Sequence, residues 1–226
     1  MDDVVRTAFR VLTFRVSRDE LVALDGRHLA FGLVCTWLVG IGRYWDDRRA
    51  TFLQHLGVGS VVYVFALSLF LFLLIWPLRP PNWSYKRLLT FVTLVSPPAA
   101  LYAIPVERML RLDTARAVNA WFLAVVALWR VSLLFFYLKR FALFRWYQAV
   151  VVGLLPLTAI VTTLFGLNLE HVVFDIMGGI RNPSPNDTAY EVLFVLTMLS
   201  FFAFVPLLIG YLVLVFVARR PSKQDG

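Results

Sequence analysis

Five long runs of apolar residues with little or no charge constrain this chain more strongly than any other feature of its sequence. They cover residues 56–78, 88–106, 117–138, 146–169 and 192–218. The hydrocarbon core of a bilayer is about 30 Å thick, and a helix needs roughly 20 apolar residues to cross it. Because every backbone amide inside lipid must be paired within the protein, runs of this length predict helices rather than strands. The runs therefore predict an all-α, polytopic membrane helix bundle.

The overall composition agrees with a membrane protein and excludes several other classes. Apolar residues make up 60% of the chain and charged residues 16%, and the mean hydropathy is +0.74. Soluble domains are about 45–50% apolar and 25% charged. A disordered chain, a coiled coil, a collagen and a disulfide scaffold are excluded. The single cysteine, Cys35, cannot form an internal disulfide, so cysteine usage does not indicate a redox compartment.

A sixth apolar run, residues 29–42, is only 14 residues long and could be a re-entrant or interfacial segment. The distribution of Lys and Arg decides between these alternatives, because cytoplasmic segments carry an excess of both. If this run crosses and the N-terminus lies inside, 14 basic residues are cytoplasmic and 7 lie outside. If it does not cross, the division is 12 to 9. The larger bias favours six spans over five, with both termini cytoplasmic.

The six spans predict one membrane domain with short cytoplasmic ends. Residues 1–28 form an N-terminal segment, residues 29–218 the transmembrane bundle and residues 219–226 a tail. Within residues 4–16, one helical face carries the apolar side chains and the other face carries Arg6, Arg10 and Thr13; the apolar set is Val4, Val5, Ala8, Phe9 and Leu12. This pattern predicts an amphipathic helix, which lies either in the cytoplasmic headgroup layer or on the cytoplasmic loops.

The net charge of +8 does not predict a nucleic-acid partner, because the basic residues are spread between the apolar runs. Nineteen of the 22 are Arg. This usage hints at a GC-rich bacterial genome, so we expect the bacterial cytoplasmic (inner) membrane. The sequence contains no Gly-x-Ser-x-Gly elbow, no His-Glu-x-x-His motif, no phosphate-binding Gly-rich loop and no Cys/His cluster. It therefore predicts no catalytic residues, no metal site and no cofactor.

Arg130 is the residue whose position in lipid is most costly. It lies in the fourth predicted span, about 12 Å from the cytoplasmic end. A charge near mid-bilayer costs at least ~2.5 kcal/mol, so Arg130 should face protein or water. Asn119, Arg130 and Tyr137 align on one stripe of this helix, which indicates a face toward the bundle interior. In the alternative, the Arg130 side chain extends to the headgroups and serves only orientation.

The third predicted span carries Ser96, Pro97 and Pro98 at a similar depth. Each proline removes an amide donor and frees a carbonyl one turn earlier, near Thr93 and Leu94. A long side chain from the neighbouring antiparallel helix can reach those oxygens. Our hypothesis is that Arg130 caps the carbonyls that the double proline releases.

Glu170, His171 and Asp175 share one side of a segment expected to lie as a helix in the outer interface. His171 and Asp175 are one helical turn apart and could share a cation or a proton. A metal site would need a third ligand, and the other histidines lie in distant segments. An ordinary solvated face is therefore the expectation, with an outer-face site as the alternative.

Arg43, Tyr44 and Trp45 directly follow the sixth run. Tyrosine and tryptophan rings are suited to the headgroup layer, while the neighbouring charges remain in water. This segment predicts an interface anchor first and a recognition surface second.

Several features resemble the Yip-domain family, small multi-spanning proteins named for their interaction with Ypt/Rab GTPases. These features are the basic and aromatic lead-in at residues 83–90, the span broken at residues 96–98, the span that holds Trp129 and Arg130, and the loop with Lys139 and Arg140. Together they cover roughly half of the chain. The family typically has five spans and a longer cytoplasmic N-terminal region. The resemblance therefore implies an architecture more than an activity.

Three hypotheses for function follow. The favoured one is a non-enzymatic membrane protein whose basic cytoplasmic face organises anionic lipids or partner proteins, among them other copies of the chain. The second is a small permease or channel for an anionic solute, lined by Asn119, Arg130 and the proline-broken spans. The third is a membrane enzyme that uses Glu170, His171 and Asp175. A water-filled cavity at Arg130 would favour the permease, and a packed interior would favour the organiser.

Overall fold

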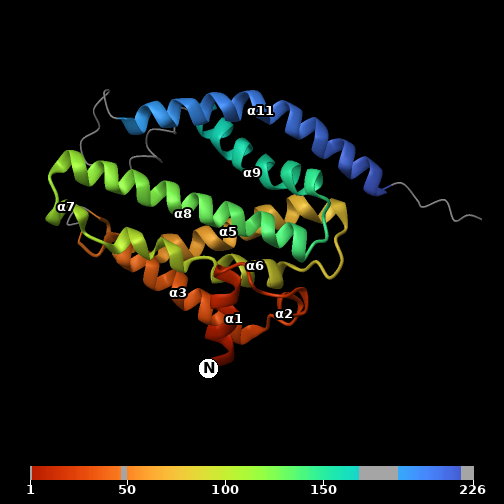
Figure 1. The fold of residues 1–226 in the computed structure, drawn as a ribbon, viewed down its shortest axis with the longest axis horizontal. Helices are drawn as coiled ribbons and strands as arrows, with labels where there is room; N and C mark the ends of the chain where they lie inside the picture. The colour runs from red at the N-terminus through yellow and green to blue at the C-terminus, as the bar shows by residue number, and fades with distance from the viewer. Residues whose placement is uncertain (1, 47–49, 168–187, 220–226) are drawn as a thin grey trace, which may run out of the picture.

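The computed structural model describes residues 2–46, 50–167 and 188–219, and every element in these ranges is helical (Figure 1). The N-terminal half holds α1 (Asp2–Leu12), α2 (Arg18–Val22), α3 (Gly26–Tyr44), α4 (Phe52–His55), α5 (Val58–Ile75), the 3₁₀ turn η1 (Trp76–Leu78) and α6 (Tyr85–Leu94). The rest holds the 3₁₀ segment η2 (Pro97–Ala103), α7 (Val106–Met109), α8 (Leu112–Arg140), α9 (Trp146–Gly166) and α11 (Thr188–Arg219). The expectation of an all-α chain is confirmed.

Four helices of the described chain are long and apolar enough to cross a membrane: Val58–Leu78, Ala117–Arg140, Trp146–Gly166 and Phe194–Arg219. They correspond to four of the runs found in the sequence. Large apolar side chains cover much of their outer surface; Leu128 is 70% exposed and Phe202 73%. Hydrocarbon, rather than water, is the medium in which so many exposed apolar side chains are stable. Four candidate spans with such surfaces indicate a multi-pass integral membrane protein.

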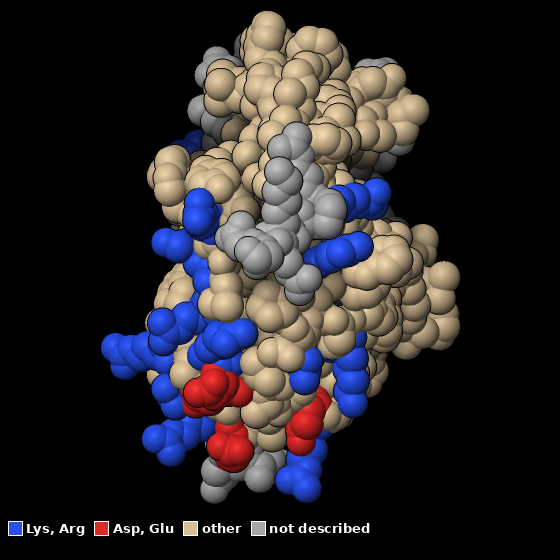
Figure 2. Space-filling view, turned by 90° about the vertical axis from the view of Figure 1, so that its right-hand side faces the viewer, with Lys and Arg blue, Asp and Glu red and all other residues tan. Residues whose placement is uncertain are grey.

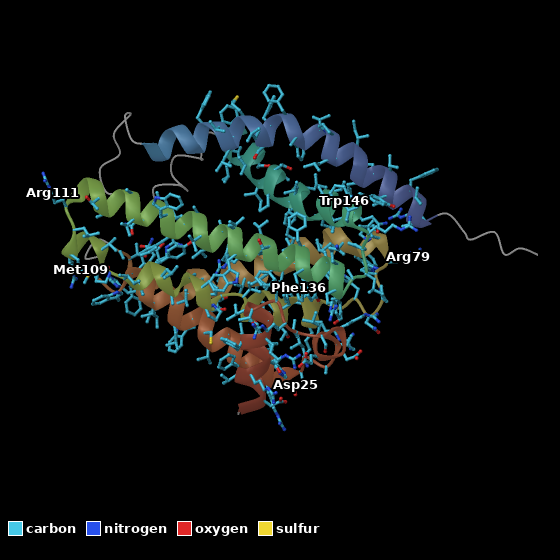
Figure 3. All side chains as sticks on the ribbon, in the orientation of Figure 1. Asp25, Arg79, Met109, Arg111, Phe136 and Trp146 are labelled. Atoms are coloured by element: carbon cyan, nitrogen blue, oxygen red, sulfur yellow. The ribbon has the colours of Figure 1, made fainter. Side chains whose placement is uncertain are left out.

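Successive long segments run back and forth between two ends of the molecule (Figures 1 and 3). Arg79 and Trp146 lie at one end, which we call the basic end, and Met109 and Arg111 lie at the other, the opposite end. Contacts along the chain fix these directions. The start of α5 meets the second half of α3, where a Cβ on Gly40 would lie 2.8 Å from the Gly57 carbonyl oxygen. The Tyr85 hydroxyl at the start of α6 donates to the Phe65 carbonyl in α5 at 3.3 Å.

The same alternation continues through the later helices. The Trp45 indole, just after α3, donates to the Ala103 carbonyl at 2.9 Å, so η2 ends beside the end of α3. Arg130 in α8 reaches the α6–η2 junction. The Tyr211 hydroxyl in α11 donates to the Leu74 carbonyl near the end of α5 at 2.7 Å. The α3 helix thus packs against the combined α6–η2 segment and α5, and the α6–η2 segment also contacts α8.

The two remaining apolar runs differ from a simple long helix. Run 29–42 lies inside the 19-residue α3, which begins at an Asp25 N-cap whose carboxylate accepts from the Arg27 and His28 amides. Run 88–106 is not one helix, because α6 ends at Leu94 and η2 begins at Pro97. Two consecutive prolines cannot donate the backbone bonds that would continue an α-helix. The chain continues instead as a tighter 3₁₀ segment.

The N-terminal segment packs on the helices near the basic end. Ala8 and Val11 of α1 are buried in a cluster with Leu88 and Phe91 of α6 and Tyr137 of α8. The Trp129 indole donates to the Leu12 carbonyl at 3.0 Å. Of the expected apolar face, Ala8 is buried, Val4 and Leu12 are half-buried, and Val5 and Phe9 are 47% and 61% exposed; Thr7 and Val11 are buried as well. The contacts with α3 and α6 select a face rotated from the one that amphipathicity alone indicates.

Candidate functional site

Arg130 is half-buried on α8 and faces the break between α6 and η2. Its Nε donates to the Val95 carbonyl and its Nη2 to the Ser96 carbonyl, both at 3.4 Å. The expected acceptors near Thr93 and Leu94 lie one to three residues earlier. The Thr93 carbonyl already accepts from the Ser96 amide at 3.1 Å. Arg130 binds the carbonyls of Val95 and Ser96 instead, and the Ser96 carbonyl also accepts from the Ala99 amide at 3.0 Å.

The other side of the break is held by α3. The Ser96 hydroxyl lies 2.7 Å from the Thr36 hydroxyl, and Thr36 also donates to the Gly32 carbonyl at 2.8 Å. Both Ser96 and Thr36 are buried. Pro97 and Pro98 follow directly as the first turn of η2, and Pro98 is buried. Thr36 is a site residue that we did not predict from the sequence.

The signal for this contact was present in the sequence as small residues four positions apart. Gly32, Thr36 and Gly40 are all buried on one face of α3. Small residues at this spacing let membrane helices approach closely. A Cβ on Gly32 would lie 2.3 Å from the Thr93 hydroxyl oxygen, so the glycine is what allows α3 to lie against α6.

The three residues predicted to share one stripe of α8, which are Asn119, Arg130 and Tyr137, do not meet at one site. Tyr137 is fully buried, and its ring stacks on Phe91 at 4.1 Å and on Phe141 at 4.8 Å between centroids. Its hydroxyl has no hydrogen-bond partner among the residues that the structure describes. Asn119 is half-buried, and eleven helical residues, about 16 Å, separate it from Arg130. Tyr137 thus belongs to the aromatic packing near the basic end, and Asn119 lies toward the opposite end.

The predicted anchor residues lie at the opposite end and contact η2 and α7. The Arg43 guanidinium carbon is 5.5 Å from the centroid of the Tyr44 ring and 5.4 Å from that of Tyr102. Trp45 is 50% exposed and stacks under Arg108, whose guanidinium carbon is 5.1 Å from the ring centroid. These contacts are within the reach of cation–π attraction. The segment is therefore tied to protein as well as being available to the headgroup layer.

The anchor and the intramembrane arginine are electrostatic neighbours. Arg43, Tyr63 and Tyr102 lie close enough to Arg130 to interact with its charge. Tyr102 in turn interacts with both arginines.

The remaining candidates are the predicted outer-face residues and a metal site. Glu170, His171 and Asp175 lie outside the described residues. Within the described ranges, no group of three or more His, Cys, Asp or Glu side chains could hold a metal ion.

The basic end carries exposed cations on several elements, and Figure 2 looks directly at it. Lys and Arg side chains surround this end, and the acidic side chains gather in its lower part. Arg79 follows η1, Lys139 and Arg140 end α8, and Arg145 precedes α9; all four are exposed.

Comparisons with known proteins do not assign the chain to a family. No protein-family model matches it, and no curated protein or solved structure does so. The functional argument therefore rests on the geometry described above.

Proposed function

We propose that this chain is a six-span, non-enzymatic protein of the bacterial cytoplasmic membrane that organises anionic lipids at its cytoplasmic face. In this topology both termini are cytoplasmic, and α3 and α6–η2 cross together with the four long apolar helices. The Yip-like layout of the sequence fits such a small polytopic organiser, and the same basic face is available to partner proteins or to a second copy of the chain.

The observation that carries the proposal is the charge of the basic end. The exposed cations Arg79, Lys139, Arg140 and Arg145 lie in two turns, the one after η1 and the one between α8 and α9, at the end where Arg79 and Trp146 lie in Figure 3. Lys and Arg near an anionic leaflet contribute about 1 kcal/mol each to lipid attraction. A set of this size on one surface supports retention of phosphatidylglycerol-type headgroups.

The contacts at the proline break favour the organiser over the permease. Arg130 donates to the two carbonyls at the break, and the Ser96–Thr36 contact closes it on the other side. The close approach of Gly32 to Thr93 leaves no room there for an added methyl group. These are features of helices held together, and they support a structural role for the broken span.

A lipid-dependent stability measurement tests the proposal. The full chain is purified in detergent, and its thermal unfolding midpoint is followed by tryptophan fluorescence with added phosphatidylglycerol or phosphatidylcholine. We expect phosphatidylglycerol to raise the midpoint more than phosphatidylcholine does. The combined variant Arg79→Gln, Lys139→Gln, Arg140→Gln and Arg145→Gln should lose most of this difference.

The matched control removes cations from the other end. Arg108 and Arg111 are exposed at the opposite end, and the double variant Arg108→Gln, Arg111→Gln should keep the phosphatidylglycerol effect. If phosphatidylglycerol raises the unfolding midpoint above that in phosphatidylcholine by the same amount in the parent chain and in the basic-end variant, the proposal is refuted.

A further inference from the structure

The α1 helix presents three different surfaces around its circumference. The surface that packs on the protein consists of small and medium uncharged residues: Thr7, Ala8 and Val11. At 3.6 residues per turn, the next sector holds Val5 and Phe9, which lie one turn apart and are both exposed. The remaining sector is charged and consists of Asp3, Arg6 and Arg10. An exposed apolar stripe therefore lies between the protein-facing and the charged sectors of α1.

Contacts with α8 and α6 fix the level at which this stripe lies. The Trp129 indole donates to the Leu12 carbonyl at the end of α1 at 3.0 Å. The Phe14 ring meets the Phe136 ring edge-on, with 5.7 Å between their centroids. Both Trp129 and Phe136 belong to the candidate span Ala117–Arg140, and Trp129 is itself partly exposed. The exposed stripe of α1 thus continues the lipid-facing surface of a helix that crosses the membrane.

The orientation of α1 suits a helix at the membrane surface. It runs across the direction of the long helices instead of along it (Figure 1). Its buried face clusters with Leu88, one turn after the start of α6, so α1 lies close to the basic end. A helix that lies in the plane of the membrane at this level meets the boundary between headgroups and acyl chains.

Charge does not explain a membrane contact at this place. The exposed charged side chains of α1, α2 and the turn between them include both signs: Arg6, Arg15, Asp3 and Asp19. Arg10 is paired with Glu20. Attraction to an anionic leaflet requires an excess of Lys and Arg, which this balanced set does not provide. Burial of apolar surface is the contribution that remains.

From these observations we infer that Val5 and Phe9 insert into the acyl–headgroup boundary of the leaflet at the basic end. The partner is the bilayer itself, whatever the charge of its headgroups. Amphipathic helices of this kind bury their apolar face about 5–10 Å into the boundary. In this position the stripe points to lipid, Ala8 and Val11 stay against the protein, and Arg6 remains in water.

This contact goes beyond the proposed function, because it uses apolar side chains and needs no anionic lipid. The basic-end variant leaves α1 unchanged, and a bilayer of phosphatidylcholine alone is sufficient to test the insertion. Failure of one proposal is thus distinguishable from failure of the other.

Spin labels on the full chain in vesicles test the insertion. With Cys35 replaced by Ala, a nitroxide is attached at Phe9→Cys or Val5→Cys, and Arg6→Cys on the same helix is the matched control. The vesicles contain phosphatidylcholine alone or an equal mixture with phosphatidylglycerol. Oxygen concentrates in lipid and a nickel chelate stays in water, so the two relaxation reagents report the surroundings of each label. We expect the ratio of oxygen to nickel accessibility to be several-fold higher at positions 5 and 9 than at position 6, in both lipids.

The two labelled positions give independent readings, because both side chains are exposed and neither label has to fit into the packed face of α1. A parent-like thermal midpoint verifies that each labelled chain is folded. Nickel accessibility at positions 5 and 9 equal to that at position 6 would place the stripe in water and overturn the inference. Labels that neither reagent reaches would place it against protein, such as a second copy, and would also overturn it. Insertion only with phosphatidylglycerol present would refute a contact that is independent of headgroup charge.

Discussion

At the scale of single residues, Gly32 shows how little space separates α3 from α6. A Cβ built there lies 2.3 Å from the Thr93 hydroxyl oxygen, 2.8 Å from the Thr93 Cβ and 3.0 Å from the Thr93 carbonyl carbon. The last of these atoms is backbone and cannot rotate away. We expect Gly32→Ala to destabilise the fold by about 1–3 kcal/mol, the usual cost of overpacking, as measured by the thermal midpoint in detergent.

Gly59 provides the matched control for this substitution. It lies in α5, and a Cβ there meets nothing within 4 Å. Alanine is up to ~1 kcal/mol more favourable than glycine inside a helix, so Gly59→Ala should be neutral or stabilising. Equal midpoints for Gly32→Ala and the parent would show that α3 does not lie this close to α6.

Arg130 gives the second prediction at this scale. Arg130→Leu removes both bonds to the broken span, and hydrogen bonds from charged groups are worth about 1.5–3 kcal/mol. We therefore expect a lower thermal midpoint in detergent for Arg130→Leu. Arg130→Lys keeps the charge but not the planar fork, so its midpoint should fall between the two. An unchanged midpoint in the leucine variant would mean that the contacts with Val95 and Ser96 do not stabilise the break.

These two residues also show what sequence alone could give. The cost of a charge in lipid singled out Arg130, and the double proline located its partner segment to within a few residues. Thr36 and Gly32 were missed because an apolar run does not indicate which neighbouring helix its small residues will contact. The carbonyls of Val95 and Ser96 could be identified as the acceptors only from the actual end of α6.

At the scale of elements, the hairpin of α1 and α2 is closed by an ion pair. Arg10 on α1 donates to Glu20 on α2, and the Glu20 carboxylate also accepts from the Ser17 amide at 2.7 Å. Burial of the Glu20 carboxyl raises its pKa, but the hydrogen bonds from Ser17 and the charges of Arg10 and Arg6 outweigh this effect. The pKa therefore lies below its ordinary value of 4.5.

A depressed carboxyl pKa has a definite consequence for stability. The stabilisation is present at neutral pH, above the unfolded-state pKa, and is lost as the pH falls through 4.5 and below. Glu20→Gln should lower stability at pH 7 by roughly 0.5–1 kcal/mol, as expected for a partly exposed pair. The difference between variant and parent should vanish near pH 3. Thermal midpoints between pH 7 and pH 3 check this.

The neighbouring Asp19 gives the control. It is exposed at the start of the same helix, and Asp19→Asn should retain the pH-dependent stabilisation that Glu20 provides. A gap between parent and Glu20→Gln that stays constant from pH 7 to pH 3 would contradict the role given to the carboxylate charge.

Elements were predictable from the sequence to different degrees. Length and lack of charge were sufficient for α5, α8, α9 and α11, because lipid leaves the backbone no alternative to a helix. The division of run 88–106 followed from two prolines, yet its 3₁₀ continuation depends on local packing. The face of α1 that packs on the protein could not be predicted from amphipathicity, because Thr7, a polar residue, packs inward while Phe9 remains exposed.

At the scale of the whole molecule, the sequence gives the direction of each segment more readily than its neighbours. The alternation of charged turns and apolar runs predicts which segment ends share a side. In helices such as α5 and α11, apolar residues cover nearly the whole circumference, so no face indicates the protein side. Contacts such as Tyr211 with Leu74 could be found only in three dimensions.

The proposed six-span topology makes a prediction for intact cells. With Cys35 replaced by Ala, single cysteines are introduced by Arg27→Cys and Thr51→Cys, at exposed positions in the first turn of α3 and beyond its end. Arg79→Cys and Arg111→Cys mark the basic and opposite ends. Because α3 crosses the membrane in this topology, a membrane-impermeant maleimide should label positions 51 and 111 but not 27 and 79. After lysis all four should react, which shows that each thiol is accessible. Equal labelling of positions 27 and 51 in intact cells would mean that α3 does not cross. The chain would then have the five-span topology, despite the weak bias of its basic residues toward one side.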